Sequence, residues 1–174
     1  MNKDLSRFHA GHEMSYQIAA AELRAGRKQS HWMWYIFPQL KGLGQSSMSE
    51  YYGIADIEEA AAYLSDPILG AHTAELCNIL LSLPTNDAYA VFGSPDDKKL
   101  RSSMTLFWLA AEDPTPFLAV LDKFFGGKCC GRTRKLSDRQ TEENYQNRRA
   151  KRQRNLSRFE QDMTEFGMRD ERKE

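Results

Sequence analysis

Apolar residues recur along most of the first 127 positions at the spacing of one helix face. In five segments they keep the i, i+3, i+4, i+7 period that is typical of an α-helix with one buried side. These apolar stripes run from Tyr16 to Leu23, from Ile57 to Leu64, from Leu69 to Leu83, from Leu100 to Ala111 and from Phe117 to Phe124. No alternation of apolar and polar residues bounded by turn signals stands out. The pattern therefore predicts an all-α fold.

Two of these segments carry clear end signals. Ser94 followed by Pro95 is typical of an N-cap and a first helical position, and the next two residues, Asp96 and Asp97, face the positive end of the helix dipole. Two glycines at 126–127 follow the last stripe, where helices commonly end. We therefore expect the compact part of the chain to end near residue 127.

The formal net charge of the 174 residues is zero, but the charges are divided unevenly. Residues 1–127 carry 10 Lys and Arg against 15 Asp and Glu, a balance of −5. Residues 128–174 carry 14 against 9, a balance of +5. We interpret the chain as a compact multi-helix domain over 1–127 with a basic C-terminal extension over 128–174, partly helical or disordered. A narrow apolar stripe favours helix in that extension; its members are Leu156, Phe159, Met163 and Phe166.

Length and composition exclude several classes of protein. A chain of this length fits one domain with a tail, and the composition excludes collagen, low-complexity disorder and a disulfide scaffold. No apolar run approaches the ~20 residues that span a bilayer, and the first residues form no apolar signal segment. Three cysteines, of which Cys129 and Cys130 are adjacent, suit a reducing compartment. We expect a cytoplasmic protein without a membrane partner.

The segment SHWMWYIFPQ (30–39) is rich in aromatic residues and has a polar rim. Aromatic residues at helical spacing are more often core than a cofactor or base-stacking site, and both interpretations stay open. If Ser30 caps a short helix that Pro38 ends, its free backbone N–H groups lie beside Lys28 and could hold an anion. His31 in that first turn would be kept neutral by the helix dipole.

A second polar segment follows the strong helix start, in KKLRSSM (98–104). Leu100 and Met104 belong to the apolar stripe, so the cations lie on its flank. A solvated basic face is one interpretation, and a partner for Arg101 is the other, because cations early in a helix oppose its dipole. The ligand-binding candidates, taken together, are Lys28, Ser30, His31, Trp34, Gln39, Lys99, Arg101 and Ser103.

The extension contains a dense basic run. Five cations stand within seven residues, namely Arg148, Arg149, Lys151, Arg152 and Arg154. Such a run is most often a solvated face, and the alternatives are contact with nucleic acid or docking on the acidic domain. Nucleic-acid contact through this run would be weak and non-specific.

The sequence contains few other motifs that indicate catalysis or cofactor binding. Dinucleotide-binding, P-loop and nucleophile-elbow motifs do not occur. His9 and His12 lie three apart but have no evident third ligand, so we predict no metal site and no cofactor. Cys77 lies on a leucine-rich stripe, where a cysteine usually acts as a small buried hydrophobic residue.

Three stretches carry a resemblance to a known family: GRKQSHWMWYIFPQLKGLGQSSMSEYYGI (26–54), VFGSPDDKKLRSSMTLF (91–107) and VLDKFFGGK (120–128). Over roughly residues 4–133 the chain resembles domain-of-unknown-function family 1810, a mainly bacterial group of small all-helical proteins without an established activity. The resemblance implies the fold and no reaction. All eight ligand-binding candidates match its motifs. The chain departs from the family pattern at four positions, with His12 in place of Gln, Asp66 in place of His, His72 in place of Arg and Cys130 in place of Asp.

Two hypotheses about function remain. In the first, the eight candidates form one pocket for a small phosphate-bearing or other anionic ligand, and whether the ligand is turned over is left open. In the second, the domain is a scaffold and its basic tail contacts nucleic acid or a protein. We favour the first, because the polar motifs exceed what a core requires.

Overall fold

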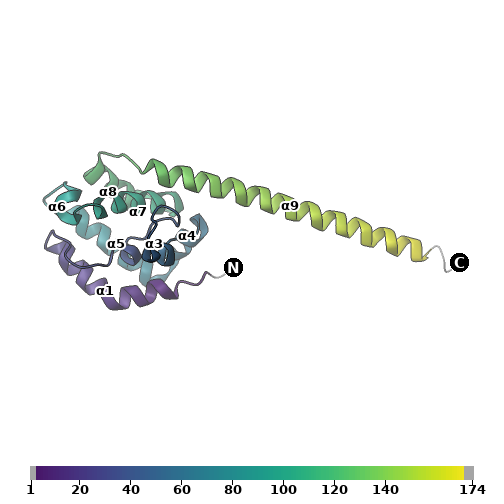
Figure 1. Cartoon of the computed structure of the whole chain (residues 1–174), viewed down its shortest axis with the longest axis horizontal. Helices are drawn as coiled ribbons and strands as arrows, with labels where there is room; N and C mark the ends of the chain where they lie inside the picture. Colours follow the sequence, from purple (N-terminus) through teal and green to yellow (C-terminus); the bar gives the residue numbers. More distant parts are fainter. Residues whose placement is uncertain (1–2, 171–174) are drawn as a thin grey trace. The chain divides into compact units, whose positions relative to one another are not determined.

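The computed structural model describes residues 3–170, apart from the side chains at 144, 145, 148, 152 and 165–170. Nine α-helices and no strand occur in this described part (Figure 1), which confirms the predicted all-α fold. The helices are α1 (Ser6–Arg24), α2 (Met33–Ile36), α3 (Ser47–Tyr52), α4 (Ile57–Ser65), α5 (Pro67–Ser82), α6 (Ala88–Phe92), α7 (Asp96–Ala110), α8 (Thr115–Phe125) and α9 (Gly131–Asp170). In the described ranges, no helix is both long and apolar enough to cross a membrane.

The five apolar stripes fall in α1, α4, α5, α7 and α8. Local signals explain where several of these helices begin and end. Asp66 caps α5 by accepting hydrogen bonds from the backbone N–H groups of Ile68 and Leu69, both at 3.0 Å, with Pro67 in the first helical position. Helix α7 begins at Asp96, one position later than the predicted Pro95. Helix α8 ends at Phe125 and is followed by Gly126 in the left-handed conformation, with a φ of +59°.

Helix α5 lies between α1 and α8 and packs against both (Figure 1). Helix α7 packs against α4, α6 and α8, so the eight shorter helices enclose one core. The fully buried side chains at its centre come from most of these elements, and include Phe8, Trp32, Tyr63, Leu76 and Phe107. Burial of these large apolar groups is the main source of stability for such a fold.

The chain divides into two compact units, residues 1–137 and residues 138–174. The sequence predicts a boundary after 127, whereas the first unit continues for ten more residues. Cys130, Thr133 and Ser137 are buried in it, and Leu136 packs against its core. In the second unit, the apolar side chains of Leu156, Phe159 and Met163 are exposed on α9.

Candidate functional site

The segment that follows α1 is held by a carboxylate that sequence reasoning missed. Glu22 accepts hydrogen bonds from the backbone N–H groups of Gln29 and Ser30, from the Ser30 hydroxyl and from the Trp32 indole N–H. Burial by itself raises the pKa of Glu22, but these four bonds outweigh it and lower the pKa to about 2. The backbone N–H and hydroxyl of Ser30, which the sequence predicts to face an anion, are therefore already bonded to Glu22.

The short aromatic helix also begins later than the sequence predicts. Ser30 does not cap it, because its hydroxyl is bonded to Glu22, and α2 starts at Met33 with Trp32 at the N-cap position. A helix of four residues provides no extended anion site at its N-terminus. The expected site over Ser30 is thus not formed as predicted.

Lys28 is also taken up by structural contacts. Its ammonium pairs with Asp96 at 2.9 Å, donates to the Ser30 carbonyl and lies 4.9 Å from the centre of the Trp32 ring. Only 7% of the Lys28 side chain is exposed. This lysine joins the loop after α1 to the start of α7. His31 is exposed, and its carbonyl accepts a bond from the Tyr35 hydroxyl at 3.4 Å.

Most of the aromatic segment is core. Trp32, Tyr35 and Phe37 are at most 5% exposed, whereas Trp34 is only half-buried. The more common interpretation of the aromatic cluster therefore holds for all of its rings except Trp34.

Two loops bring the next polar residues beside Trp34. A parallel bridge joins Leu40 to Ile54, with the Ile54 N–H donating to the Gln39 carbonyl at 2.9 Å and the Lys41 N–H donating to the Ile54 carbonyl at 2.8 Å. At Gly53 a Cβ atom would lie 2.8 Å from Lys41 Cα and 2.8 Å from the Ser49 carbonyl oxygen, so only glycine permits this approach.

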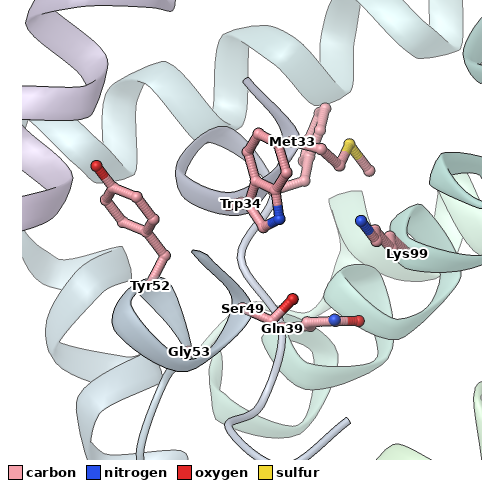
Figure 2. A pocket seen from close by; sticks show the side chains of 8 residues that line it. Met33, Trp34, Gln39, Ser49, Tyr52, Gly53 and Lys99 are labelled. Atoms are coloured by element: carbon pink, nitrogen blue, oxygen red, sulfur yellow. The ribbon is translucent and has the colours of Figure 1, made fainter. Parts of the chain in front are cut away.

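Eight residues line a small pocket at this place, which we call the Trp34 pocket (Figure 2). They are Met33, Trp34, Phe37, Gln39, Ser49, Tyr52, Gly53 and Lys99. Figure 2 shows the Trp34 indole in the middle, Lys99 pointing toward it from α7, and Gln39 and Ser49 next to each other. The structure thus brings together three of the eight candidates, Trp34, Gln39 and Lys99.

The polar groups of the Trp34 pocket retain bonding capacity. Lys99 lies 5.4 Å from the Trp34 ring centre and makes a long ion pair of 3.5 Å with Asp96, which already holds Lys28. Two lysines thus share one carboxylate, leaving a local excess of positive charge. Within the described residues, the side-chain amide of Gln39 has no hydrogen-bond partner.

Arg101 and Ser103 do not line this pocket. Residues of an α-helix are 100° apart around its axis, so Arg101 points about 200° away from Lys99. Ser103 is fully buried, and its hydroxyl has no hydrogen-bond partner in the described part of the chain. The eight candidates therefore do not form one site, and Lys28, Ser30, His31, Arg101 and Ser103 lie outside the Trp34 pocket.

A second polar cluster is formed by side chains of α1, α4 and α5, and we call it the histidine network: His12, Tyr16, Tyr63, His72 and Glu75. The His12 ring at the centre of the cluster is buried, with 3% of the residue exposed. Its Nε2 lies 3.0 Å from the Tyr35 carbonyl oxygen and 2.7 Å from the Tyr63 hydroxyl. Its Nδ1 lies 2.9 Å from Nδ1 of His72. Since a carbonyl only accepts, Nε2–H of His12 donates to it, and its bare Nδ1 accepts from His72.

The histidine network keeps its central ring neutral. Burial lowers the pKa of His12 to about 4, and His72 acts in the same direction. Tyr16 stacks on His72 with ring centres 3.5 Å apart and donates to Glu75, which also pairs with Arg24 at 2.7 Å. Sequence reasoning noted His72 only as a departure from the family pattern, and His12 as such a departure and as a neighbour of His9. The separation of 60 positions between His12 and His72 gave no local signal that they meet.

The neighbouring His9 pairs with Asp66 at 2.8 Å, whereas His12 contacts His72, so the two histidines have different partners. Across the described ranges, no group of three or more His, Cys, Asp and Glu residues is arranged to hold a metal ion.

In α9, the basic residues Arg149, Lys151 and Arg154 are exposed. The other two members of the run, Arg148 and Arg152, have side chains outside the described residues.

A family model described as "Protein of unknown function (DUF1810)" matches residues 2–137. The chain belongs to this family. The DUF1810 match ends at the same residue as the first compact unit. The chain is also similar to the conserved hypothetical protein Rv1873 from Mycobacterium tuberculosis, whose crystal structure is known. The two sequences are 44% identical, the match covers 76% of this chain and 95% of that chain, and the structures superpose with a TM-score of 0.75. A search of curated proteins finds no match. Neither the DUF1810 description nor that of the similar structure names a ligand or a reaction.

Proposed function

We propose that this chain binds a small anionic ligand at the Trp34 pocket. Lys99 holds the negative group, and Gln39 and Ser49 bond its oxygen atoms. Trp34 and Tyr52 contact the flat or apolar remainder of the ligand. The observation that carries the proposal is the position of Lys99 over the Trp34 ring with only a long, shared ion pair.

Charge and bonding capacity both support this assignment. Asp96 cannot neutralise Lys28 and Lys99 together, and its shorter contact is with Lys28. An anion at Lys99 restores the balance. The side-chain amide of Gln39, which lines the pocket, offers two hydrogen-bond donors and one acceptor to a ligand there.

The size of the pocket limits what enters it. Its cavity volume of about 10 Å³ is room for roughly one water-sized group. One oxygen of a phosphate or carboxylate therefore fits inside, and the rest of the ligand lies over the opening to solvent. Phosphate-bearing metabolites fit this description because their terminal oxygens carry the charge.

Ligand-induced thermal stabilisation tests the proposal. The full chain is melted with inorganic phosphate, ribose 5-phosphate and AMP as probes. A probe that binds only the folded state adds about 2.7 kcal/mol to the free energy of unfolding at 100 times its Kd. We expect at least one probe to raise Tm, and Lys99→Met to abolish the rise.

Arg101→Met is the matched control, because it removes a cation from the same helix outside the pocket. It should leave the rise in Tm unchanged. A rise that persists in Lys99→Met, or that disappears in Arg101→Met, contradicts the assignment, as does the absence of a rise with all three probes.

The exposed cations of α9 support a second candidate function, weak contact with nucleic acid. Arg149, Lys151 and Arg154 are exposed, and no acidic residue stands between positions 144 and 159. A protein that neutralises phosphates releases counterions, so the logarithm of its affinity falls with the logarithm of salt concentration by about 0.9 per phosphate on duplex DNA.

Binding of the full chain to a short duplex DNA, measured by anisotropy at several salt concentrations, tests this candidate. We expect a slope of roughly −3 to −5 and little sequence preference. Changing Arg149, Lys151 and Arg154 together to Gln should reduce the slope by about 3. An unchanged slope would move the contact away from α9.

A further inference from the structure

The three cysteines of this chain are free thiols in three different environments. Cys77 on α5 is fully buried, and burial raises its pKa to about 12. Cys129 is half-buried, and Cys130 is 8% exposed immediately before α9. The adjacent pair is therefore chemically unlike Cys77.

Polar groups from two helices hold Cys130. Its carbonyl accepts from the Arg134 N–H at 3.2 Å, so Cys130 is the N-cap of α9. Its own N–H donates to Thr105 Oγ1 at 2.8 Å, and the Ser102 hydroxyl donates to its Sγ at 3.3 Å. Burial alone would raise the pKa of Cys130, but the hydroxyls of Ser102 and Thr133 and the backbone N–H groups of the first turn of α9 lower it overall.

A second buried hydroxyl lies beside this thiol. Thr133 is fully buried in the first turn of α9, close to the Cys130 sulfur. Among the described residues its hydroxyl has no hydrogen-bond partner of normal geometry. Such a group is costly to bury, and it can donate to an oxygen atom attached to the sulfur. On the other side, the Arg134 guanidinium lies 3.9 Å from Cys129 Sγ.

We propose that Cys130 is a site of oxidation by small hydroperoxides, and that Cys129 is the thiol that resolves the oxidised product. This inference does not depend on the ligand proposed for the Trp34 pocket. It uses three features together: a hydrogen-bonded thiol at a helix N-terminus, the buried Thr133 hydroxyl beside it and a second thiol adjacent in the chain.

The chemistry balances in two steps. The Cys130 thiolate attacks the terminal peroxide oxygen, the S–O bond forms, the O–O bond breaks, and the leaving hydroxide of hydrogen peroxide, or alkoxide of an organic hydroperoxide, is protonated to water or an alcohol. The sulfur is oxidised by two electrons to a sulfenic acid, and the peroxide is reduced. Cys129 then attacks this sulfur, the S–S bond forms, and the sulfenic hydroxyl leaves as water with the Cys129 proton.

The resulting disulfide should be easily reduced. Cα atoms of adjacent residues are about 3.8 Å apart across a trans peptide, shorter than the 4.4–6.8 Å usual for a disulfide. Strain of this kind makes a disulfide labile, as in regulatory rather than structural bonds. The modification is therefore reversible by ordinary thiols.

Mass spectrometry of the peroxide-treated full chain tests the proposal. Trypsin cuts after Lys128 and Arg132, which releases both adjacent cysteines in one peptide that lacks Cys77. We expect hydrogen peroxide to oxidise this peptide to the disulfide at least about tenfold faster than it modifies Cys77. Dithiothreitol should reverse the change.

Single variants separate the roles of the two thiols. In Cys129→Ser, a dimedone probe should trap sulfenic acid at Cys130, because the resolving thiol is gone. In Cys130→Ser, neither product should form. Cys130→Asp retains an N-cap acceptor for α9 and keeps the comparison valid if the serine variant does not fold. If the peptide is oxidised at the wild-type rate in these Cys130 variants, or if Cys77 reacts equally fast, the proposal is wrong.

Two neighbouring serines, Ser102 and Ser103, allow a matched test of whether a hydrogen bond to the Cys130 sulfur controls its reactivity. Ser102 donates to the Cys130 sulfur, whereas the buried Ser103 hydroxyl has no partner in the part of the chain that is described. Ser102→Ala should raise the pKa of Cys130, measured from the pH dependence of its alkylation by iodoacetamide, and slow its oxidation several-fold. Ser103→Ala should change neither. Equal effects of the two substitutions would show that the Ser102 hydroxyl does not position this thiol and would overturn the proposed site.

Discussion

The Trp34 pocket and the histidine network are both polar clusters within the first compact unit, but their polar groups are satisfied to different degrees. At the centre of the network, both ring nitrogens of His12 have partners within 3.0 Å. In the pocket, Lys99 has one shared ion pair at 3.5 Å and the Gln39 amide has no partner in the described chain. Since satisfied buried groups stabilise a fold and unsatisfied ones remain available, the network should contribute stability and the pocket should contribute binding.

The largest expected effect is the loss of His12. His12→Ala removes a buried ring and leaves the polar groups around it without their partner. We expect it to lower the free energy of unfolding by about 3 kcal/mol. Urea denaturation followed by circular dichroism measures this loss.

His12→Gln is the control for that experiment, because glutamine keeps a donor and an acceptor and is the residue of the family pattern. Its cost should stay below about 1 kcal/mol. A loss under 1 kcal/mol in His12→Ala would mean that the network adds little to stability and that the contrast with the pocket is wrong.

The second effect is a dependence of stability on pH. The pKa of His12 is about 4 in the folded chain and 6.5 for an ordinary histidine. Because the folded pKa is lower, the unfolded chain binds the proton first, so stability is complete above pH 6.5 and falls as pH drops toward 4. Between pH 7.5 and 4.5 we expect a loss of about 2 kcal/mol.

Other titratable groups beside His12 also contribute to the dependence of stability on pH. The pKa of His72 is also lowered by burial and adds a loss of the same sign. Asp66 and Glu75 have pKa values lowered from 3.8 and 4.5, so they add a loss of the same sign that begins only at the acid end of the chosen range. His9 also faces this cluster, paired with Asp66. His12→Gln should remove most of the slope, and an unchanged slope would assign it to His72.

The sequence predicted the long helices well because their signal is local. Each stripe with a 3.6-residue period became α1, α4, α5, α7 or α8. The short helices α3 and α6 were missed, since a helix of five or six residues is too short to show a period. The predicted boundary at 127 also differs from the end of the compact unit at 137, because Thr133 and Ser137 are polar residues that only their packing buries.

The candidate site was predicted only in part, for physical reasons. Ser30 looked like a helix cap, but Glu22 from the preceding helix competes for its hydroxyl. Lys99 and Arg101 are close in sequence yet point in opposite directions from one helix. Pairings between distant positions, such as His12 with His72, leave no trace in local periodicity.

Lys28 and Lys99 differ in the same way, because both pair with the Asp96 carboxylate but only Lys28 is buried. Lys28 is 7% exposed and holds Asp96 at 2.9 Å, so Lys28→Met breaks a buried ion pair. We expect a loss of about 1 kcal/mol in the free energy of unfolding, because Lys99 remains to neutralise Asp96 in part. Thermal and urea unfolding measure it, and an unchanged free energy would show that Lys28 is not a structural residue.

The smallest expected effect on stability belongs to Lys99, and it is the sharpest test of the comparison. Lys99 keeps 24% of its side chain exposed, and its ion pair with Asp96 is long and shared. Lys99→Met should therefore change the free energy of unfolding by less than about 0.5 kcal/mol, while it removes the stabilisation by the phosphate probes. Urea unfolding without and with each probe measures both quantities on the same variant. A large loss of stability without any probe would place Lys99 with Lys28 among the structural residues, and the Trp34 pocket would then have no spare cation with which to bind an anion.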